Sequence, residues 1–414
     1  MKLVKTIRNL PPAVRIFLGL VLVFSVGQGL VALAKTQVTP WPKRLEHVRI
    51  ESPWSELLAE DIEPDNAWYF FLRMTNKNDR SSSTEFREDV RRFNAFGLST
   101  NTYAQLASWR ADHPHFIQRW KKAGQTETAQ APTPKNYGWL DCRTAVIQSY
   151  QCAALIAEKA ARDGAWSEFD TWLSTGLRAS DHLSRGSGVS FAMEHQRSSE
   201  LFLRVLRRVA HQHEPPIDRL KNWQDQLDAI TADLEPPESV YQIELELHRQ
   251  RLNHLYTNPQ EAIDGSRRAA THGMVRVAEN MGLLALWSLG GSTLPNTDEH
   301  CVAVYTHLID AVSKPYDPQL NSPMALARHT FFNKVDDPIG RTWALPFLRP
   351  QNNGYRRHQA NLAATRLTLA LLRYRADHEN RLPSKLEQLV PDYIEALPED
   401  PFSRQREGFL YATK

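Results

Sequence analysis

Cysteine and glycine are scarce in this chain, and each shortage excludes a class of protein. Three cysteines, Cys142, Cys152 and Cys301, are too few and too scattered for a disulfide framework or for a zinc site, which uses close pairs of ligands. Eighteen glycines stand against 25 prolines, a balance that disfavours a β-rich fold with many tight turns. Long helices that end at prolines fit this composition better.

The cysteines also limit the possible disulfides. Cys142 and Cys152 fall in one predicted helix, where ten residues span about 15 Å, beyond the reach of a disulfide. Two possibilities remain: buried free thiols that act as small apolar residues, or a bridge from Cys301 to one of the others in an oxidising compartment. We expect free thiols.

Net charge is also small once the start of the chain is set aside. The formal charge is +3, and the first 34 residues carry four basic residues (Lys2, Lys5, Arg8 and Arg15) and no acidic one, which leaves −1 for the remainder. A nearly neutral body without a basic stripe lacks the surface that binds nucleic acid. We therefore expect no nucleic-acid partner.

Residues 1–34 have the features of an export segment that contacts the membrane. An apolar run, Ile16–Val26, follows the basic front, and Ala32-Leu33-Ala34 has the form of a signal-peptidase site that would release a chain beginning at Lys35. Alternatively, Ile16–Ala34 is a tilted span, just long enough for a hydrocarbon core about 30 Å thick. A cytoplasmic amphipathic start is the third possibility. We expect a single-pass inner-membrane protein with its body exported to the periplasmic side, because basic flanks stay cytoplasmic.

Helical periodicity dominates the rest of the chain. It predicts a mostly α protein, in which a membrane segment precedes an antiparallel α-hairpin (tetratricopeptide-like) array and a long C-terminal helix with a small hairpin tail. The predicted regions are 1–34, a signal-anchor or signal peptide; 35–135, a linker and N-terminal helical region; 136–256, the α-hairpin array; 257–354, an irregular helical region; and 355–414, the long helix and tail.

The hairpin array rests on helices joined by short turns. A helix over Leu140–Arg162 is followed by "RDGAWSEF", where a glycine break and an aromatic residue resemble a tetratricopeptide turn. Helices over Ser198–His213 and Pro216–Ala232 follow, and a third begins at Pro237. Proline suits the first turn of a helix, where a missing N–H leaves no bond unmade.

Two segments of the region before the array carry further expectations. "NAWYFFLRM" (Asn66–Met74) begins an apolar helix with Asp65 or Asn66 as its N-cap. Gly124–Asn136 is polar, contains two prolines and is predicted to be an exposed connection.

The tail is predicted to pack on the long helix, which should cover Arg356–Glu379. The apolar face of that helix consists of Ala360, Ala363, Ala364, Leu367, Ala370, Leu371 and Tyr374. A short helix after Pro383 carries Leu386 and Leu389, and residues 402–411 can form a small hairpin. We expect the aromatic residues Phe402, Phe409 and Tyr411 to hold this hairpin on the long helix.

This arrangement resembles the C-terminal part of type II secretion pseudopilins. The matching residues are Tyr374-Arg-Ala-Asp-His, Leu382-Pro383, Leu386, Leu389, Asp400-Pro401-Phe402 and Tyr411. The chain also resembles a group of uncharacterised bacterial envelope proteins that have an N-terminal membrane segment, a helical-hairpin middle and this tail, a resemblance that implies no known activity. Pseudopilins begin with a processed glycine-phenylalanine and carry an early glutamate, whereas the apolar helix here starts at Ile16 without an acid. The chain is therefore not a pilin subunit.

The pseudopilin resemblance implies a possible calcium loop in the tail. Glu399, Asp400 and Glu407 would be its acids, but Arg404 and Arg406 lie among them as competing cations. Calcium also needs about six to eight oxygen ligands around one point. We expect packing, not an ion, to hold the tail.

Histidines and acids form only weak candidate sites. Glu244, Glu246, His248 and His254 lie on one predicted helix. Glu244 and His248 are four residues apart, so they face the same way and could bind a metal with a third ligand elsewhere. A solvated helix face is the simpler interpretation. His211 and His213 lie at a predicted helix end, where cationic histidine suits the dipole. Short histidine-containing segments at 113–116 and 298–301 are coincidences of the same kind.

Other motifs are interpreted as structural. "RGSGVS" (Arg185–Ser190) lacks the lysine of a phosphate loop and the flanked serine of a hydrolase, and is predicted to be a helix-to-helix turn. Most of the tryptophans considered as glycan platforms occupy apolar helical positions, which predicts core packing; they are Trp109, Trp120, Trp166, Trp172, Trp223 and Trp287.

No catalytic, cofactor-binding or metal-binding residue is assigned from the sequence. The leading hypothesis is a non-enzymatic, membrane-tethered helical scaffold of the cell envelope, whose hairpin array binds another protein. The alternatives are an envelope hydrolase with a site between the helical middle and residues 257–350, or an accessory of a type II secretion or pilus-like assembly.

Overall fold

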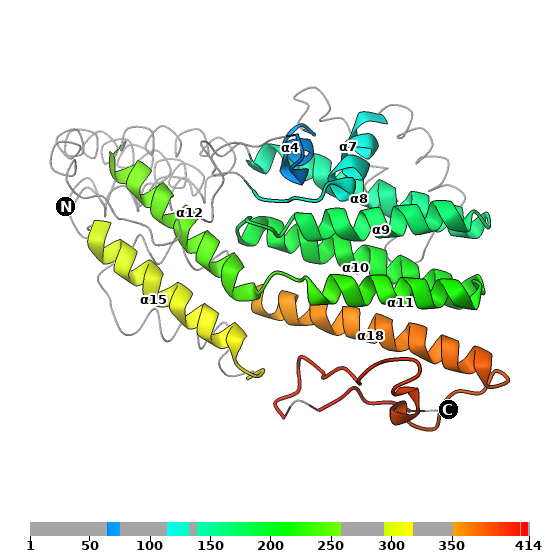
Figure 1. The fold of residues 1–414 in the computed structure, drawn as a ribbon. Helices are drawn as coiled ribbons and strands as arrows, with labels where there is room; N and C mark the ends of the chain where they lie inside the picture. The colour runs from blue at the N-terminus through cyan, green and yellow to red at the C-terminus, as the bar shows by residue number, and fades with distance from the viewer. Residues whose placement is uncertain are drawn as a thin grey trace, which may run out of the picture. The chain divides into compact units, whose positions relative to one another are not determined.

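The computed structural model describes residues 64–74, 114–131, 139–257, 294–317, 351–405 and 407–412. These residues are mostly helical and contain no β-strand, which confirms the predicted all-α character (Figure 1). The chain divides into two compact units, and the second comprises Pro53–Leu247, Tyr305–Ala325 and Phe347–Lys414. Everything described below lies in this second unit, apart from the far ends of α12 and α15.

Three helices form the centre of this unit: α8 (Trp139–Arg162), α9 (Trp166–His182) and α10 (Val189–Gln212). The α8–α9 turn contains the predicted glycine break, because Gly164 has a φ of +72°, a left-handed conformation that favours glycine. The Gly164 N–H bonds to the carbonyl of Ala161 and the Ala165 N–H to that of Ala160, a Schellman end. α10 begins at Val189, well before the predicted Ser198.

Prolines start the next two helices as predicted. Pro216 is the N-cap of α11 (Ile217–Ala232), and Pro237 is the first residue of α12 (Pro237–Thr257). α11 and α10 both pack against α18 (Gln351–Asp377), whose predicted range was Arg356–Glu379 (Figure 1).

The N-terminal helices dock through backbone hydrogen bonds. Asn66 caps α4 (Ala67–Leu72), with its Oδ1 accepting from the Trp68 N–H at 3.0 Å, as one of the two predicted caps. The segment after α7 (Pro114–Gln125) was predicted to be an exposed connection, and this prediction is wrong for Ala131, the last residue of the segment that the structure describes. Ala131 is buried and donates its N–H to the Arg185 carbonyl at 3.1 Å, because this segment closes over the end of α9.

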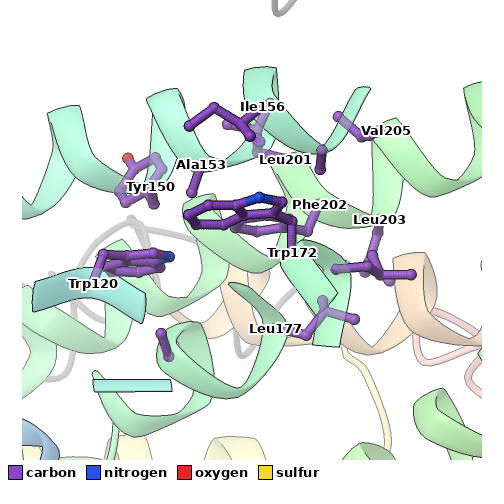
Figure 2. Close-up of a cluster of buried hydrophobic side chains, with 14 of the residues drawn as sticks. Trp120, Tyr150, Ala153, Ile156, Trp172, Leu177, Leu201, Phe202, Leu203 and Val205 are labelled. Atoms are coloured by element: carbon purple, nitrogen blue, oxygen red, sulfur yellow. The ribbon is translucent and has the colours of Figure 1, made fainter. Parts of the chain in front are cut away.

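The core is built from aromatic and small side chains of α7 to α11. Trp120 and Trp223 are fully buried and Trp172 nearly so, which confirms core packing for these three tryptophans. Figure 2 shows Trp172 beside Phe202, between Ala153 and Leu177. α9 and α10 approach closely there, since a Cβ on Gly176 would lie 2.2 Å from the Phe202 Cζ. Trp166 packs against the core half-buried, while Trp109 and Trp287 lie outside the described residues.

α18 is buried on two sides, which explains the long run of small and apolar residues in it. Leu362 and Leu369 join the main core, whereas Leu367 and Ala370 pack against the tail. The tail contributes the 3-10 helix η2 (Leu386–Leu389) and Ile394 to this second cluster, and Phe409 and Tyr411 pack against it.

The predicted hairpin is present as one antiparallel bridge, Glu399 to Gly408, beside a hydrogen bond from the Asp400 N–H to the Glu407 carbonyl of 2.8 Å. Phe402 does not join the α18 cluster as predicted. It stands edge-to-face with Tyr316, which follows α15 (Leu294–Ser313), with ring centroids 5.2 Å apart.

Among the described residues, none of the helices combines the length and apolarity needed to cross a membrane. The predicted export segment, residues 1–34, lies outside them. Cys142 and Cys152 both lie on α8, as predicted, and Cys152 is a buried free thiol whose pKa burial raises. The side chains of Cys142 and Cys301 are outside the described set.

Candidate functional site

Buried polar side chains gather where the α9–α10 turn meets the starts of α12 and α18. We call this cluster the polar junction. Its buried members are Ser180, Asp181, His182, Ser184, Ser187, His195, Ser198, Glu244 and His358.

The α9–α10 turn is the "RGSGVS" segment, and the structure places it between two helices, as predicted. Arg185 holds the turn by donating from Nε to Asp181 Oδ2 at 2.8 Å and by pairing with Asp233 after α11. His182 contacts the carbonyl of Ala123 through Nδ1 at 2.9 Å, and burial lowers the pKa of this histidine. These contacts tie α7, α9 and α11 together.

Glu244 serves as a cap within the junction. Its Oε2 accepts the Val189 N–H at 2.7 Å, so a carboxylate from α12 satisfies the N-terminus of α10. The solvated face predicted for this part of α12 is wrong for Glu244 and Glu246, which are both buried. The side chains of His248 and His254 lie outside the described residues, and within the described part no three histidine, cysteine or acidic residues form a metal cluster.

The other histidine candidates stay apart from the junction. His211 lies in the last turn of α10 and His213 is its C-cap, the helix-end position that the sequence predicted. Residue 113 is outside the described residues, and the segment 298–301 lies within α15.

His195 of α10 and His358 of α18 form the centre of the junction. Their rings meet edge-to-face, with centroids 4.7 Å apart, and their exposed fractions are 6% and 2%. His195 Nδ1 lies 2.8 Å from the Ser180 carbonyl and therefore donates to it. Neither ring nitrogen of His358 has a hydrogen-bond partner among the described residues. Burial lowers the pKa of both histidines, and for His358 the neighbouring His195 lowers it further.

A small cavity of about 30 Å³ opens beside His195. It is lined by Ser184, Ala192, His195, Gln196, Leu234, Glu235, Pro237, Val240, Tyr241 and Tyr355. Burial raises the pKa of Glu235 to about 7, Asp181 adds to this rise, and a hydrogen bond from Ser239 of 2.8 Å opposes it. A cavity of this size holds about one or two waters, whereas ligand sites usually exceed roughly 300 Å³.

Glu194 is another buried acid, and its carboxylate is used in hydrogen bonds and ion pairs between helices. Its carboxylate accepts from Arg143 Nη2 at 2.6 Å, from Arg197 Nη1 at 2.8 Å and from the Tyr150 hydroxyl at 3.2 Å. Glu194 has no exposed side-chain surface, so these charge-assisted bonds hold α8 to α10.

Arg356 links the start of α18 to two other segments. It donates from Nη2 to the Lys314 carbonyl at 2.6 Å, just beyond α15, and from Nη1 to the Pro401 carbonyl at 3.1 Å. A guanidinium suits the negative end of the α15 dipole. α18 therefore joins the bundle, the end of α15 and the tail.

The tail carries most of the exposed large hydrophobic side chains among the described residues. Among the described residues four large hydrophobic side chains are exposed, and three of them lie in the tail: Leu382, Val390 and the fully exposed Leu410. Asp400, a calcium candidate, accepts the Phe402 N–H at 2.9 Å in the turn, and Arg404 pairs with Asp317 at 3.4 Å rather than with its acidic neighbours in the tail.

Sequence reasoning missed His195, His358 and Glu194. A usable signal existed, because His195 follows the buried Phe191 and Ala192 at helical spacing and His358 precedes Leu362 by four residues. Polar residues on a core stripe indicate a buried polar network.

Comparison with known proteins assigns no family: no family model matches the chain, and no curated protein or solved structure is significantly similar to it.

Proposed function

We propose that this protein is a non-enzymatic, membrane-tethered helical scaffold of the cell envelope that binds another protein through its tail. The observation that carries the proposal is the exposure of Leu382, Val390 and Leu410 on a tail whose inner side is fixed to α18. Contiguous exposed apolar surface marks interaction sites, and a hydrogen bond between the chain neighbours of Leu382 and Leu410 brings these two residues to the same part of the tail.

Hydrogen bonds tie the tail together and to α11 and α18, which supports recognition by a partner. Tyr411 donates its hydroxyl to the Pro383 carbonyl at 2.9 Å, a bond between the immediate neighbours of Leu410 and Leu382. The Tyr393 carbonyl accepts from Gln224 of α11 at 2.6 Å and from Arg373 of α18 at 3.2 Å. A surface ordered before binding loses little conformational entropy on association.

The interior supports a structural role for the body. The polar groups of the junction cap helices and join turns, and its cavity has room for about one or two waters. The short turns between α8, α9, α10 and α11 support the finer proposal of an antiparallel α-hairpin array. Arrays of this kind present extended surfaces to protein partners.

Membrane tethering rests on the sequence of residues 1–34. The basic front followed by Ile16–Ala34 supports a single-pass inner-membrane location with the body on the periplasmic side. The membrane would then be the partner of this segment, and the tail would bind its protein partner in the envelope.

Site-specific photocrosslinking tests the docking surface. A photoreactive amino acid placed at Leu410 or Leu382 in the full chain, expressed in its own cell envelope, should give one discrete protein adduct. Ile217 on α11 is the matched control, since it is 47% exposed against 50% for Leu382. Leu410→Asp should abolish the adduct formed from position 382. Equal adducts from all three positions, or none from the tail, would refute the proposal.

An accessory role in a type II secretion or pilus-like assembly is the second candidate. It is supported by the tail, where Leu386 and Leu389 pack on a long helix and Asp400 forms a tight turn before Phe402. The same crosslinks would then contain a component of that assembly. The hydrolase hypothesis places its site between the helical middle and residues 257–350, and of the latter 258–293 and 318–350 lie outside the described residues.

A further inference from the structure

The first half of α18 meets α10 through an unusual contact. Further along this interface, Arg207 donates to Thr365 Oγ1 at 2.5 Å, and Leu362 and Leu369 join the apolar core. Near the start of α18 the contact is instead two buried imidazoles, His195 and His358, with ring centroids 4.7 Å apart. This pair can change charge near neutral pH, unlike the apolar and arginine contacts beside it.

We propose that His195 and His358 form an acid-sensitive latch, which holds α18 against α10 at neutral pH and loosens below about pH 6. A proton added to His358 would place a charge on a ring that has no hydrogen-bond acceptor among the described residues. The ionisable group that acts on its pKa is His195, which offers no negative charge to offset the proton. Burying an unpaired charge is unfavourable, so the charged state favours separation of the helices.

The groups around the pair modify this response without cancelling it. Asp181 of α9 favours a charged His195, whereas Arg185 in the following turn disfavours it and also pairs with Asp181. Glu235, before α12, lines the cavity with His195. On α18 itself, Tyr355 lines that cavity and Arg356 donates to the Lys314 and Pro401 carbonyls.

The sign of the pH effect follows from which state binds protons. Burial holds the pKa of both histidines below the ordinary 6.5, so below that pH the opened state takes up protons that the closed state does not. Each such histidine weakens closure by about tenfold per pH unit. Glu235 acts oppositely: its pKa is raised from 4.5 to about 7, so the closed state retains a proton in that window and closure is favoured as pH falls. Two histidines outweigh this single carboxyl.

Release of this helix end would reach the tail. Arg356 lies two residues before His358 and bonds the carbonyls of Lys314 and Pro401. Separation of α18 from α10 would therefore disturb the turn that contains Asp400 and Phe402. The latch couples acidity to the conformation of the tail.

Hydrogen exchange of the full chain at pH 7.5 and pH 5.5, corrected for intrinsic exchange rates, tests the latch. The protection of amides in residues 355–365 should fall about fivefold more than that of α9 amides, because the two histidines weaken closure by up to about a hundredfold over this interval and Glu235 offsets up to about twentyfold of that. His358→Phe keeps an aromatic ring that cannot be protonated and should remove most of this difference. His378→Gln is the control, because His378 lies just beyond the end of α18 and is exposed, and it should behave as the unmodified chain does.

A second variant keeps the test decisive if His358→Phe does not fold. Glu235→Gln removes the carboxyl that opposes the histidines and should enlarge the acid-induced loss of protection by up to about twentyfold. The latch would be refuted if α18 and α9 lost protection equally in the unmodified chain. It would also be refuted if His358→Phe retained the full pH response, if Glu235→Gln reduced it, or if His378→Gln abolished it.

Discussion

The two faces of α10 are packed by different chemistry. On the α8 and α9 side, Phe202 fills the space that Gly176 leaves open, and the Ser180 and Ser198 hydroxyls form a hydrogen bond of 2.5 Å. Both carboxylate oxygens of Glu194 accept hydrogen bonds there. On the α18 side, two buried imidazoles meet and one has no hydrogen-bond partner among the described residues. The first interface is held by close packing and by hydrogen bonds and ion pairs to Glu194. The second contains the latch that we propose, so we expect α18 and the tail to open more readily than the bundle of α8, α9 and α10.

The largest expected effect is on the permanent interface. Phe202→Ala should lower the free energy of unfolding by about 3–5 kcal/mol, because the ring is fully buried and leaves a cavity against Gly176. Denaturant unfolding followed by tryptophan fluorescence measures this change. A loss below about 1 kcal/mol would show that α9 and α10 do not depend on this contact.

A smaller effect is expected in the tail. Leu389→Ala should cost about 2–3 kcal/mol, since Leu389 is fully buried but belongs to a small cluster that can partly collapse. Protease cleavage after residue 380 should become faster in this variant, while α8 to α10 stay resistant. Unfolding of the whole unit in one step would contradict separate stabilities for bundle and tail.

The turn in the tail should contribute less again. Asp400→Ala removes the acceptor of the Phe402 N–H and should cost about 1 kcal/mol. Thermal unfolding detects this loss, and Asp400→Asn, which keeps an acceptor oxygen, serves as its control. Millimolar calcium should leave the melting temperature of the unmodified chain unchanged. A calcium-dependent rise that Asp400→Ala abolishes would replace packing with ion binding.

The smallest effect is expected at the proposed docking surface. Leu410→Ser should change stability by less than about 0.5 kcal/mol, because the side chain is fully exposed. This substitution should weaken the protein adduct formed by a photoreactive amino acid at position 382, while the melting temperature stays the same. A clear loss of stability would show that Leu410 contributes to packing rather than to recognition.

Local signals in the sequence predicted much of the helical framework. The ends of α8 and α11 were predicted within one residue, because Gly164 and Pro216 act through their own backbone geometry. The start of α10 was missed because residues 189–197 include Glu194 and His195, polar residues on a core stripe. Their partners, Arg143 and the Ser180 carbonyl, are remote in sequence, so no local pattern reveals them.

The candidate site depended even more on tertiary contacts. His358 and His195 are separated by more than 150 residues, and nothing in their local spacing brings them together. Phe402 was predicted on α18 for its aromatic character, yet its ring contacts Tyr316. Composition and periodicity indicate that a side chain is buried, whereas the contact partner depends on the path of the whole chain.

Native-state hydrogen exchange in increasing low denaturant, at neutral pH, tests the contrast between the two interfaces most directly. Amides of α8, α9 and α10 should exchange only through global unfolding, with the highest free energies and the steepest dependence on denaturant. Amides in the first half of α18 and in η2 should exchange through a smaller opening, with lower free energies and shallower slopes. The same free energy and slope for all of these helices would contradict the account, because α18 and the tail would then open only with the bundle.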